Sequence, residues 1–484
     1  MSFGLRVRDG IRLAFQLGNN WISLTGAALT TSSAFVLIWF WFMEITGRPE
    51  QVNPYMGILL FVALPALFVA GLALIPLGIL RVRRKNRLAG ETPLPLKAVD
   101  FKNPGVRHLL TMVGILTFIN VSILGTAGMK GVEYMDSNQF CGLTCHTVMS
   151  PEYTAFLDSP HSRVGCAQCH IGHGAPALVR AKISGARQLF AVAFGTYSRP
   201  IPSPVEHLRP ARETCEQCHW PQKFTDDKLI IRTKYAEDEA NTPSSTVLLL
   251  KIGGHSANGT TGIHGRHLDA MARISYVTTD TRRQEIPKVI YRDDQGKLVE
   301  FVSDEYKNLP KEKLDKATTR QMDCVDCHNR PTHAFQLPDR AIDKALANGR
   351  MSAGLPFLKK KALELLKVDY PDQKTAAAKI PVELAEYYRT TYPEIFKQKR
   401  GQVDTAGEVV KSIYLHNVFP EMKLTWGTHP NNIGHEDSVG CFRCHDGSHT
   451  SADGRTIKGD CDTCHILLAQ DEKDPKILKE LGMK

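Results

Sequence analysis

Long apolar runs in this 484-residue chain lie almost entirely before residue 130. Three of them are long enough to cross a bilayer, which takes about 20 mostly apolar residues. They run from about Trp21 to Met43, from about Tyr55 to Leu80 and from about Leu109 to Met129. The second contains Pro65 and Pro76. Proline is tolerated inside a span because neighbouring helices can satisfy the backbone groups that it leaves without a hydrogen bond. The runs predict three N-terminal transmembrane helices, in preference to three core helices of a soluble protein.

The flanking charges predict the orientation of these helices. Arg6, Arg8 and Arg12 precede the first run, Arg81, Arg83, Arg84, Lys85 and Arg87 follow the second, and only Arg48, beside Glu50, lies between the two. Cytoplasmic loops carry the excess of lysine and arginine, so the N-terminus and the second loop should be cytoplasmic. The first run is too long for the apolar part of a signal peptide, and a second spanning run follows it, so we expect it to remain as an anchor.

The chain after residue 130 is polar and rich in proline and glycine. Alternating apolar residues predict strands, with a hairpin turn near Asp293, and residues 338–400 show helical spacing. The expected parts are a membrane anchor over 1–130, a module of short helices and loops over 131–220, a β-rich insert over 221–323 and a helical module over 324–484. So few apolar runs predict little core built from side chains alone.

The candidate chemistry is carried by twelve cysteines in six pairs, each followed at once by a histidine. Five are Cys-x-x-Cys-His: Cys166, Cys169 and His170; Cys215, Cys218 and His219; Cys324, Cys327 and His328; Cys441, Cys444 and His445; Cys461, Cys464 and His465. The first, Cys141, Cys145 and His146, is longer by one residue. This motif is the attachment signature of c-type haem, with two thioether bonds and a proximal histidine ligand. We therefore expect six covalently bound c-type haems, so that residues 131–220 and residues 324–484 each form a three-haem module.

Zinc sites and disulfides are the competing readings of these cysteines. A structural zinc site would take two Cys-x-x-Cys pairs for its four ligands, and an oxidising compartment permits disulfides. Neither gives a reason for a histidine after every pair. Haem attachment also agrees with the orientation predicted from the flanking charges. Bacteria attach c-type haem outside the cytoplasm, and residues after about 130 should lie on that side. The predicted location is the bacterial inner membrane with the haem domain in the periplasm.

Low-spin electron-transfer haems usually have a second protein ligand. The candidates are His161, His207, His264, His267, His333, His435 and His449, together with Met149 shortly after His146. The weaker candidates are His173, His255, His416 and His429. The sequence leaves open which residue serves which site. The only histidine before His146 is His108, so a bis-histidine haem inside the membrane part is excluded.

Three segments, Phe140–Met149, Ser159–Gly172 and Leu208–Trp220, resemble the NapC/NirT family of membrane-anchored multihaem cytochromes. The resemblance covers mainly residues 105–225, and the C-terminal half is similar to larger inner-membrane cytochromes related to that family. It implies a membrane-anchored multihaem cytochrome c. Together with the elements predicted above, the expected fold is three transmembrane helices followed by a haem-packed, mainly helical and loop periplasmic domain with a small β-rich insert. It also implies electron transfer from menaquinol or ubiquinol to periplasmic redox partners.

In such proteins the haem nearest the membrane faces the quinol, and the matching site here is the first motif. By resemblance, Met149 matches the family's methionine that follows the first haem histidine, with a spacing that differs by one. The chain departs from the common form in having three predicted spans, six haem motifs and a longer first motif.

Quinol oxidation releases two electrons and two protons, so a proton acceptor is needed beside the electron acceptor. Lys130, Glu133 and Asp136 lie between the third run and the first motif. We hypothesise that Glu133 or Asp136 accepts a proton and that Lys130 binds the quinone oxygen, against the alternative of ordinary interfacial anchoring. The predicted function is transfer of electrons from menaquinol to a periplasmic cytochrome or reductase, with no nucleic-acid partner. The alternatives are an electron-wiring subunit of a larger respiratory complex and a periplasmic reductase with an open haem position.

Overall fold

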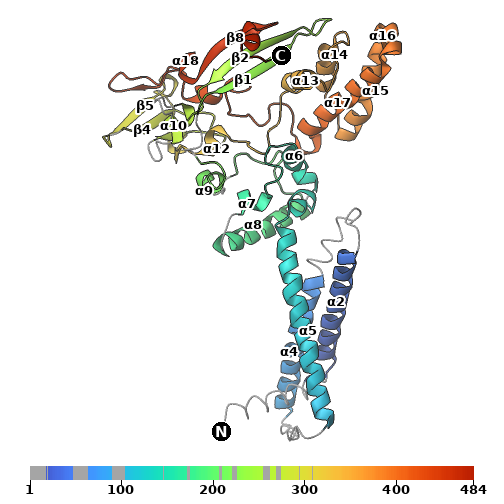
Figure 1. The fold of residues 1–484 in the computed structure, drawn as a ribbon. Coiled ribbons are helices and arrows are strands. Elements are labelled where there is room, and N and C mark those ends of the chain that lie inside the picture. The colour runs from blue at the N-terminus through green and yellow to red at the C-terminus, as the bar shows by residue number, and fades with distance from the viewer. Residues whose placement is uncertain are drawn as a thin grey trace. The chain divides into compact units, whose positions relative to one another are not determined.

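The computed structural model describes residues 18, 20–46, 64–89, 104–144, 146–171, 175–205, 210–220, 226–253, 262–268, 274–293, 295–307 and 309–483. They form two compact units, Met1–Thr144 and Cys145–Lys484 (Figure 1).

The first unit consists of long helices. They are α2 (Trp21–Thr46), α4 (Leu64–Leu88) and α5 (Pro104–Met135), followed by one π-helical turn, η3 (Phe140–Thr144). Among the described residues, the helical segments Trp21–Ile38 and Leu64–Leu88 are long and apolar enough to cross a membrane. The basic segment after the second run, expected as a loop, instead continues α4 to Leu88. The third predicted run lies within the continuous helix α5, and its role as a span stays a prediction.

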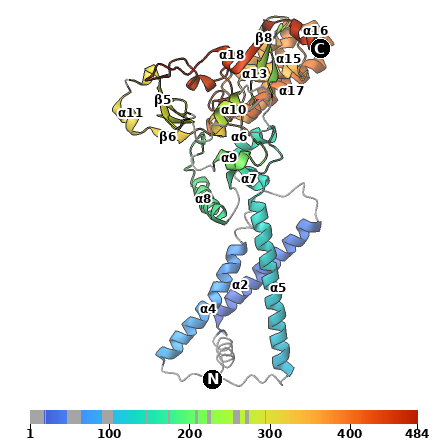
Figure 2. The same ribbon diagram turned by 60° about the vertical axis from the view of Figure 1, so that its left-hand side comes forward.

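Helices α2 and α4 cross in close contact through small residues (Figure 2). A Cβ atom at Gly26 would lie 2.6 Å from the carbonyl oxygen of Gly71, and one at Gly71 would lie 2.5 Å from Thr30 Oγ1. The hydroxyl of Ser23 donates a hydrogen bond across the contact to the carbonyl oxygen of Ile75, at 2.9 Å. Small residues that let backbones approach, with a polar bond between them, are how helices associate in a membrane.

The second unit begins with helices connected by short segments. They are α6 (His146–Leu157), α7 (Cys166–His170), α8 (Ala175–Ala193) and α9 (Ala211–Cys215). Further short elements are α10 (Ile263–Leu268), η5 (Asp304–Tyr306), α11 (Lys311–Asp315), α12 (Cys324–Cys327), η6 (Pro420–Met422), η7 (Gly440–Arg443), α18 (Cys461–Cys464) and α19 (Lys476–Glu480).

Two antiparallel sheets follow. One has the order β1-β2-β8, from β1 (Lys228–Tyr235), β2 (Pro243–Leu250) and β8 (His465–Glu472). The other has the order β6-β3-β4-β5-β7, from β3 (Ile274–Thr278), β4 (Lys288–Arg292), β5 (Leu298–Val302), β6 (Thr318–Gln321) and β7 (Thr450–Ser451). The hairpin predicted near Asp293 is the β4–β5 connection, with Arg292 opposite Leu298. Each sheet also takes a strand from beyond residue 440, which the sequence did not indicate. The limits of the four expected parts stay a prediction.

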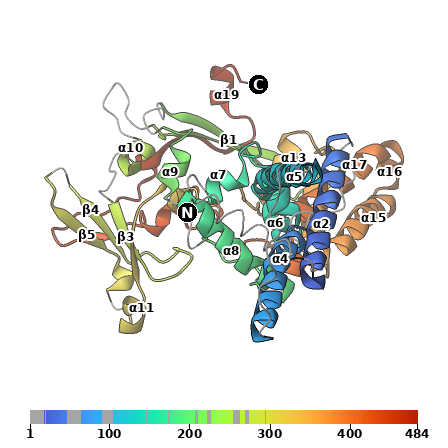
Figure 3. The ribbon, with the colours of Figure 1, turned by 90° about the horizontal axis from the view of Figure 1, so that it is seen from below.

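The helical end of the second unit has a side-chain core of its own, contrary to the expectation of little core. It is built from α13 (Pro338–Ala347), α14 (Leu358–Leu366), α15 (Gln373–Thr391), α16 (Pro393–Gln398) and α17 (Arg400–Asn417). Its apolar residues recur at helical spacing rather than in runs, for example Leu358, Leu365 and Leu366 on α14, and they are buried. These helices and the five-stranded sheet lie at opposite ends of the unit (Figures 1 and 3).

The turn between β1 and β2 fixes the three-stranded sheet to this helical core. Asn241, in the left-handed region at φ 46°, donates to the carbonyl oxygens of Ala353 and Leu355 and accepts from the backbone N–H of Lys359. Beside it, Lys359 and Asp343 form a buried ion pair at 2.7 Å. The sheet that carries the last attachment motif is thereby anchored to the folded helices.

Candidate haem-binding sites

Each regular Cys-x-x-Cys-His motif lies on or beside a single helical turn. The second and fourth motifs form α7 and α12, the third begins at the end of α9, the fifth overlaps η7 and the sixth forms α18. Residues three apart on a helical turn project to the same side, so the two thiols of a motif can face one bound group. No disulfide joins any two of the eleven described cysteines.

The histidine that ends each regular motif faces a second histidine from elsewhere in the chain. Their ring centres are 5.9 to 6.3 Å apart. The pairs are His170 with His333, His219 with His161, His328 with His264, His445 with His267, and His465 with His435. All five partners are among the histidines that the sequence suggests as second ligands.

Backbone hydrogen bonds fix the rings of most of these partners. The Nδ1 atoms of His264 and His267 lie 2.8 Å from the carbonyl oxygens of Ile252 and Ile263. Nδ1 of His333 lies 2.9 Å from the carbonyl oxygen of Glu152, and Nδ1 of His161 lies 3.3 Å from that of Pro331. Because a carbonyl can only accept, Nδ1 carries the proton, and Nε2 keeps the lone pair that binds a metal.

One other predicted second ligand, His449, has a different place. Both ring nitrogens of the buried His449 are engaged, Nδ1 with Asp446 Oδ1 and Nε2 with the carbonyl oxygen of Ile286, each at 2.9 Å. This histidine holds a loop against the five-stranded sheet, and we leave it out of the ligand set. His207 lies outside the described residues.

The longer first motif begins in a π-helical turn. Its residues from Cys141 to Thr144 belong to η3. A π turn holds one residue more than an α turn, which matches the one extra residue between the two cysteines. Cys145 and the side chain of His146 lie outside the described residues, and Met149 is half-buried on α6.

The residues suggested for quinol chemistry lie at the end of α5. Lys130 Nζ and Glu133 Oε2 form an exposed ion pair at 2.7 Å, and Asp136 follows the last turn of the helix. An exposed ion pair of this kind contributes about 0–1 kcal/mol to stability. Either side chain can therefore leave the pair and bind another group at little cost in free energy.

Consecutive sites are neighbours in space. A hydrogen bond between the Cys215 and Cys324 thiols lowers the pKa of Cys215, which places the third site beside the fourth. Burial, and then the nearby Cys215 thiol, raises the pKa of Cys169 in the second site. Burial raises the pKa of Cys444 to about 12, with a further rise from Cys327 of the fourth site.

The fifth and sixth sites are also neighbours in space. Burial raises the pKa of Cys464 in the sixth site, and the nearby Cys441 thiol of the fifth site raises it further. Sites two to six therefore follow one another in space in the order of the sequence.

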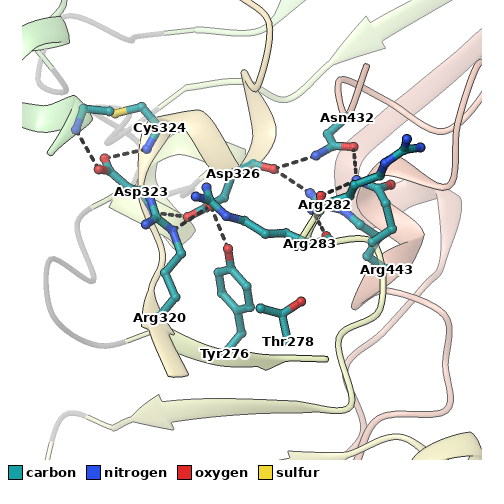
Figure 4. A network of polar contacts seen from close by, with 12 residues as sticks. Tyr276, Thr278, Arg282, Arg283, Arg320, Asp323, Cys324, Asp326, Asn432 and Arg443 are labelled. Carbon is teal, nitrogen blue, oxygen red and sulfur yellow. Dashed lines mark hydrogen bonds and ion pairs between the residues drawn. The ribbon is translucent and has the colours of Figure 1, made fainter. Parts of the chain in front are cut away.

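A buried polar network joins the third, fourth and fifth motifs (Figure 4). Asp323 caps α12 and also accepts a hydrogen bond from the backbone N–H of Ala211, at the start of α9. Asp326, between the fourth pair of cysteines, accepts from the Tyr276 hydroxyl at 2.7 Å. Burial and the nearby Asp326 carboxylate raise the pKa of Tyr276, so the phenol stays a neutral donor.

Three arginines complete this network. Arg283 and Arg320 donate to Asp326 Oδ1 at 3.2 and 3.1 Å. Arg443, between the cysteines of the fifth motif, donates to the backbone carbonyl oxygen of Asp326 at 2.6 Å. The interior residue of one attachment motif thus holds the interior residue of the next.

A second polar cluster holds the partner of the second site. Buried Arg330 forms an ion pair with partly buried Glu152 at 2.8 Å, and Arg330 also donates to the carbonyl oxygen of His333. Glu152, which follows Met149 closely, belongs to this pair.

Comparison with known proteins agrees with this geometry. Residues 104–201 match the model of the NapC/NirT cytochrome c family, N-terminal region. The chain is 42% identical over 467 residues, or 95% of its length and 91% of the relative's, to "Cytochrome c-type protein ImcH" of Geobacter sulfurreducens. The chain belongs to the NapC/NirT cytochrome c family. No solved structure matches it significantly.

As a member of the NapC/NirT family, the chain is a membrane cytochrome c with covalently bound c-type haem. The residues present fit that group. Two imidazoles on one metal, with bonds of about 2 Å and about 1.1 Å from each nitrogen to its ring centre, have centres about 6 Å apart. The five observed pairs have this separation. When bound, c-type haem supplies an iron that accepts and releases one electron at a time.

Proposed function

We propose that this chain carries electrons from membrane menaquinol to a periplasmic redox partner by means of six c-type haems. The observation that carries the proposal is the set of five histidine pairs, each with one member in an attachment motif and ring centres about 6 Å apart. Family membership supports quinol-linked electron transfer in general. The periplasmic side is supported by the positive-inside rule.

We assign the axial ligands of the five regular sites to those pairs. His333 serves the second site, His161 the third, His264 the fourth, His267 the fifth and His435 the sixth. Met149 stays the candidate for the first site. The thiol contacts between consecutive sites support a single row in sequence order.

At the quinol end, the chain's own residues manage the protons. Glu133 or Asp136 accepts a proton from the quinol hydroxyl, and Lys130 donates a hydrogen bond to the quinone oxygen. The exposed ion pair between Lys130 and Glu133 keeps the two side chains close together until quinol binds. The positive charge at Lys130 favours the negative oxygen that develops as the proton leaves.

The ligand assignment is tested by removal of one partner histidine. His264→Ala should convert one haem of the purified chain from low spin to high spin in the ferric visible and electron paramagnetic resonance spectra. His449→Ala is the matched control, because its ring is hydrogen-bonded on both nitrogens, and it should leave the spin state unchanged. A low-spin His264→Ala protein, or a high-spin His449→Ala protein, contradicts the assignment.

The quinol reading is tested by reduction of the purified chain with a menaquinol analogue. Quinol should reduce the haems of the wild type, and Lys130→Gln and Glu133→Gln should slow this reduction without any effect on reduction by dithionite. No reduction by quinol would favour a wiring subunit that takes electrons from a neighbouring protein. A high-spin ferric signal in the wild type would favour a reductase.

A further inference from the structure

Helix α8 exposes large apolar side chains along one side. Ile183, Phe190 and Phe194, which directly follows the helix, are 68%, 65% and 75% exposed. Residues spaced by four and seven lie on one side of a helix, and the rings of Phe190 and Phe194 stack at 6.4 Å with an angle of 4° between them. Together these three residues form an apolar stripe.

A different side of the same helix is polar. Ser184 and Gln188, one turn apart, are exposed and joined by a hydrogen bond at 3.4 Å. Every residue from 183 to 190 is exposed, and the described contact with the rest of the unit is made near the end of the helix, where Val192 packs beside Val148 and Phe419.

An amphipathic helix of this length is marginal in water, because most helical stability in proteins comes from packing of the apolar face. Among the described residues, the apolar stripe of α8 is exposed rather than packed. An exposed apolar stripe of this kind marks an interaction surface.

The charge of α8 indicates what covers it. Its 19 residues include Arg180, Lys182 and Arg187 and no acidic residue. A helix with phenylalanine and isoleucine on one side and only basic charge elsewhere suits the interface of a bilayer with anionic lipids. Because the chain is already held to a membrane, binding of α8 costs little loss of translational freedom.

We propose that α8 lies in the interface of the lipid bilayer. Ile183, Phe190 and Phe194 enter the boundary between headgroups and acyl chains, and the basic residues contact the phosphates of anionic lipids. The surface is a second membrane attachment, separate from the transmembrane helices and independent of the proposed quinol chemistry.

The first test measures the reactivity of introduced thiols. Variants of the full holoprotein carry Phe190→Cys, Ile183→Cys or, on the polar side, Gln188→Cys, and are placed in nanodiscs of phosphatidylethanolamine and phosphatidylglycerol. Val382→Cys on α15 is the matched control, because Val382 is also 65% exposed. A charged, membrane-impermeant thiol reagent should modify the first two variants at least about tenfold more slowly than Gln188→Cys and Val382→Cys. Equal rates at all four positions overturn the proposal.

The second test identifies what covers the stripe. Phe190 is replaced by the photoreactive residue benzoylphenylalanine, and the irradiated protein is analysed by mass spectrometry, again with Val382 as the control position. A phospholipid adduct at position 190 and none at 382 supports the proposal. An adduct to a second copy, to another protein or to a haem of this chain overturns it, as does the absence of a lipid adduct.

Discussion

Arg443 is expected to contribute strongly to the stability of the haem domain. It lies between the two cysteines of the fifth motif and is buried. Its guanidinium donates to the carbonyl oxygens of Asp326 at 2.6 Å, Arg283 at 2.8 Å and Gly440 at 2.8 Å. Arg443→Met keeps most of the unbranched stem and removes all three donors, so it isolates the hydrogen bonds from the packing.

The magnitude follows from those bonds. A hydrogen bond to a charged group contributes about 1.5–3 kcal/mol, and a buried carbonyl without a partner costs about 1–3 kcal/mol. Water can reach part of the vacated space, so we expect a loss of about 4 kcal/mol rather than the full sum. For a unit of this size that loss lowers the unfolding midpoint by roughly 6 °C. Arg443→Lys should recover part of the loss, because a single ammonium cannot reproduce the planar fork of donors.

The assay is thermal unfolding of the detergent-solubilised holoprotein, followed by circular dichroism and by visible haem absorbance. The matched control is Arg455→Met, because Arg455 pairs with the neighbouring Asp453 at the exposed surface. Its midpoint should equal that of the wild type. An Arg443→Met midpoint equal to that of the control would refute the view that this arginine holds the fourth and fifth motifs together.

Three further predictions concern other parts of the chain. Glu152→Gln leaves Arg330 buried without its countercharge and should destabilise the haem domain by about 3–5 kcal/mol, measured as a lower unfolding midpoint. Burial, and then Arg330, lowers the pKa of His429 to about 4. The unfolded chain therefore binds the extra proton first, and stability should fall as pH drops from about 6.5 towards 4, by about 2 kcal/mol at pH 5. His429→Phe should remove that part of the difference between unfolding at pH 7 and at pH 5. Gly71→Leu should separate α2 from α4 and lower the midpoint of the membrane unit, whereas Gly128→Leu, with nothing within 4 Å of its Cβ position, should not.

Much of the local structure could be predicted from the sequence. The first apolar run and the β4–β5 hairpin are each encoded by a short continuous stretch of sequence. The structure has a helix at the run and a hairpin at the predicted turn. Residues 338–400 showed helical spacing in the sequence, but the side-chain core that these helices build was missed. Its leucines are interrupted by charged residues, such as the three lysines after Leu358, and never form a long apolar run. The contribution of β7 and β8 to the two sheets was missed because their partners lie about 150 residues or more earlier in the chain.

The sequence did not show which second histidine faces which motif histidine, and the reason is different. His161 lies just before the second motif, but its ring faces His219 of the third. His333 lies just after the fourth motif, but its ring faces His170 of the second. Nearness along the chain would therefore assign His161 and His333 to other sites than their ring contacts do.

This exchange of partners has a consequence for assembly. Because a histidine next to one motif faces the histidine of another, no regular site is complete until a second part of the chain has folded against it. His264 and His267 lie three residues apart on α10 and face the fourth and fifth sites, so this one short helix fixes both. Ligand binding is then coupled to folding, and the bonds of Asp323 and Arg443 between motifs add to the same coupling. Sites two to six should therefore form as one cooperative unit, in which loss of α10 disturbs two sites at once rather than one.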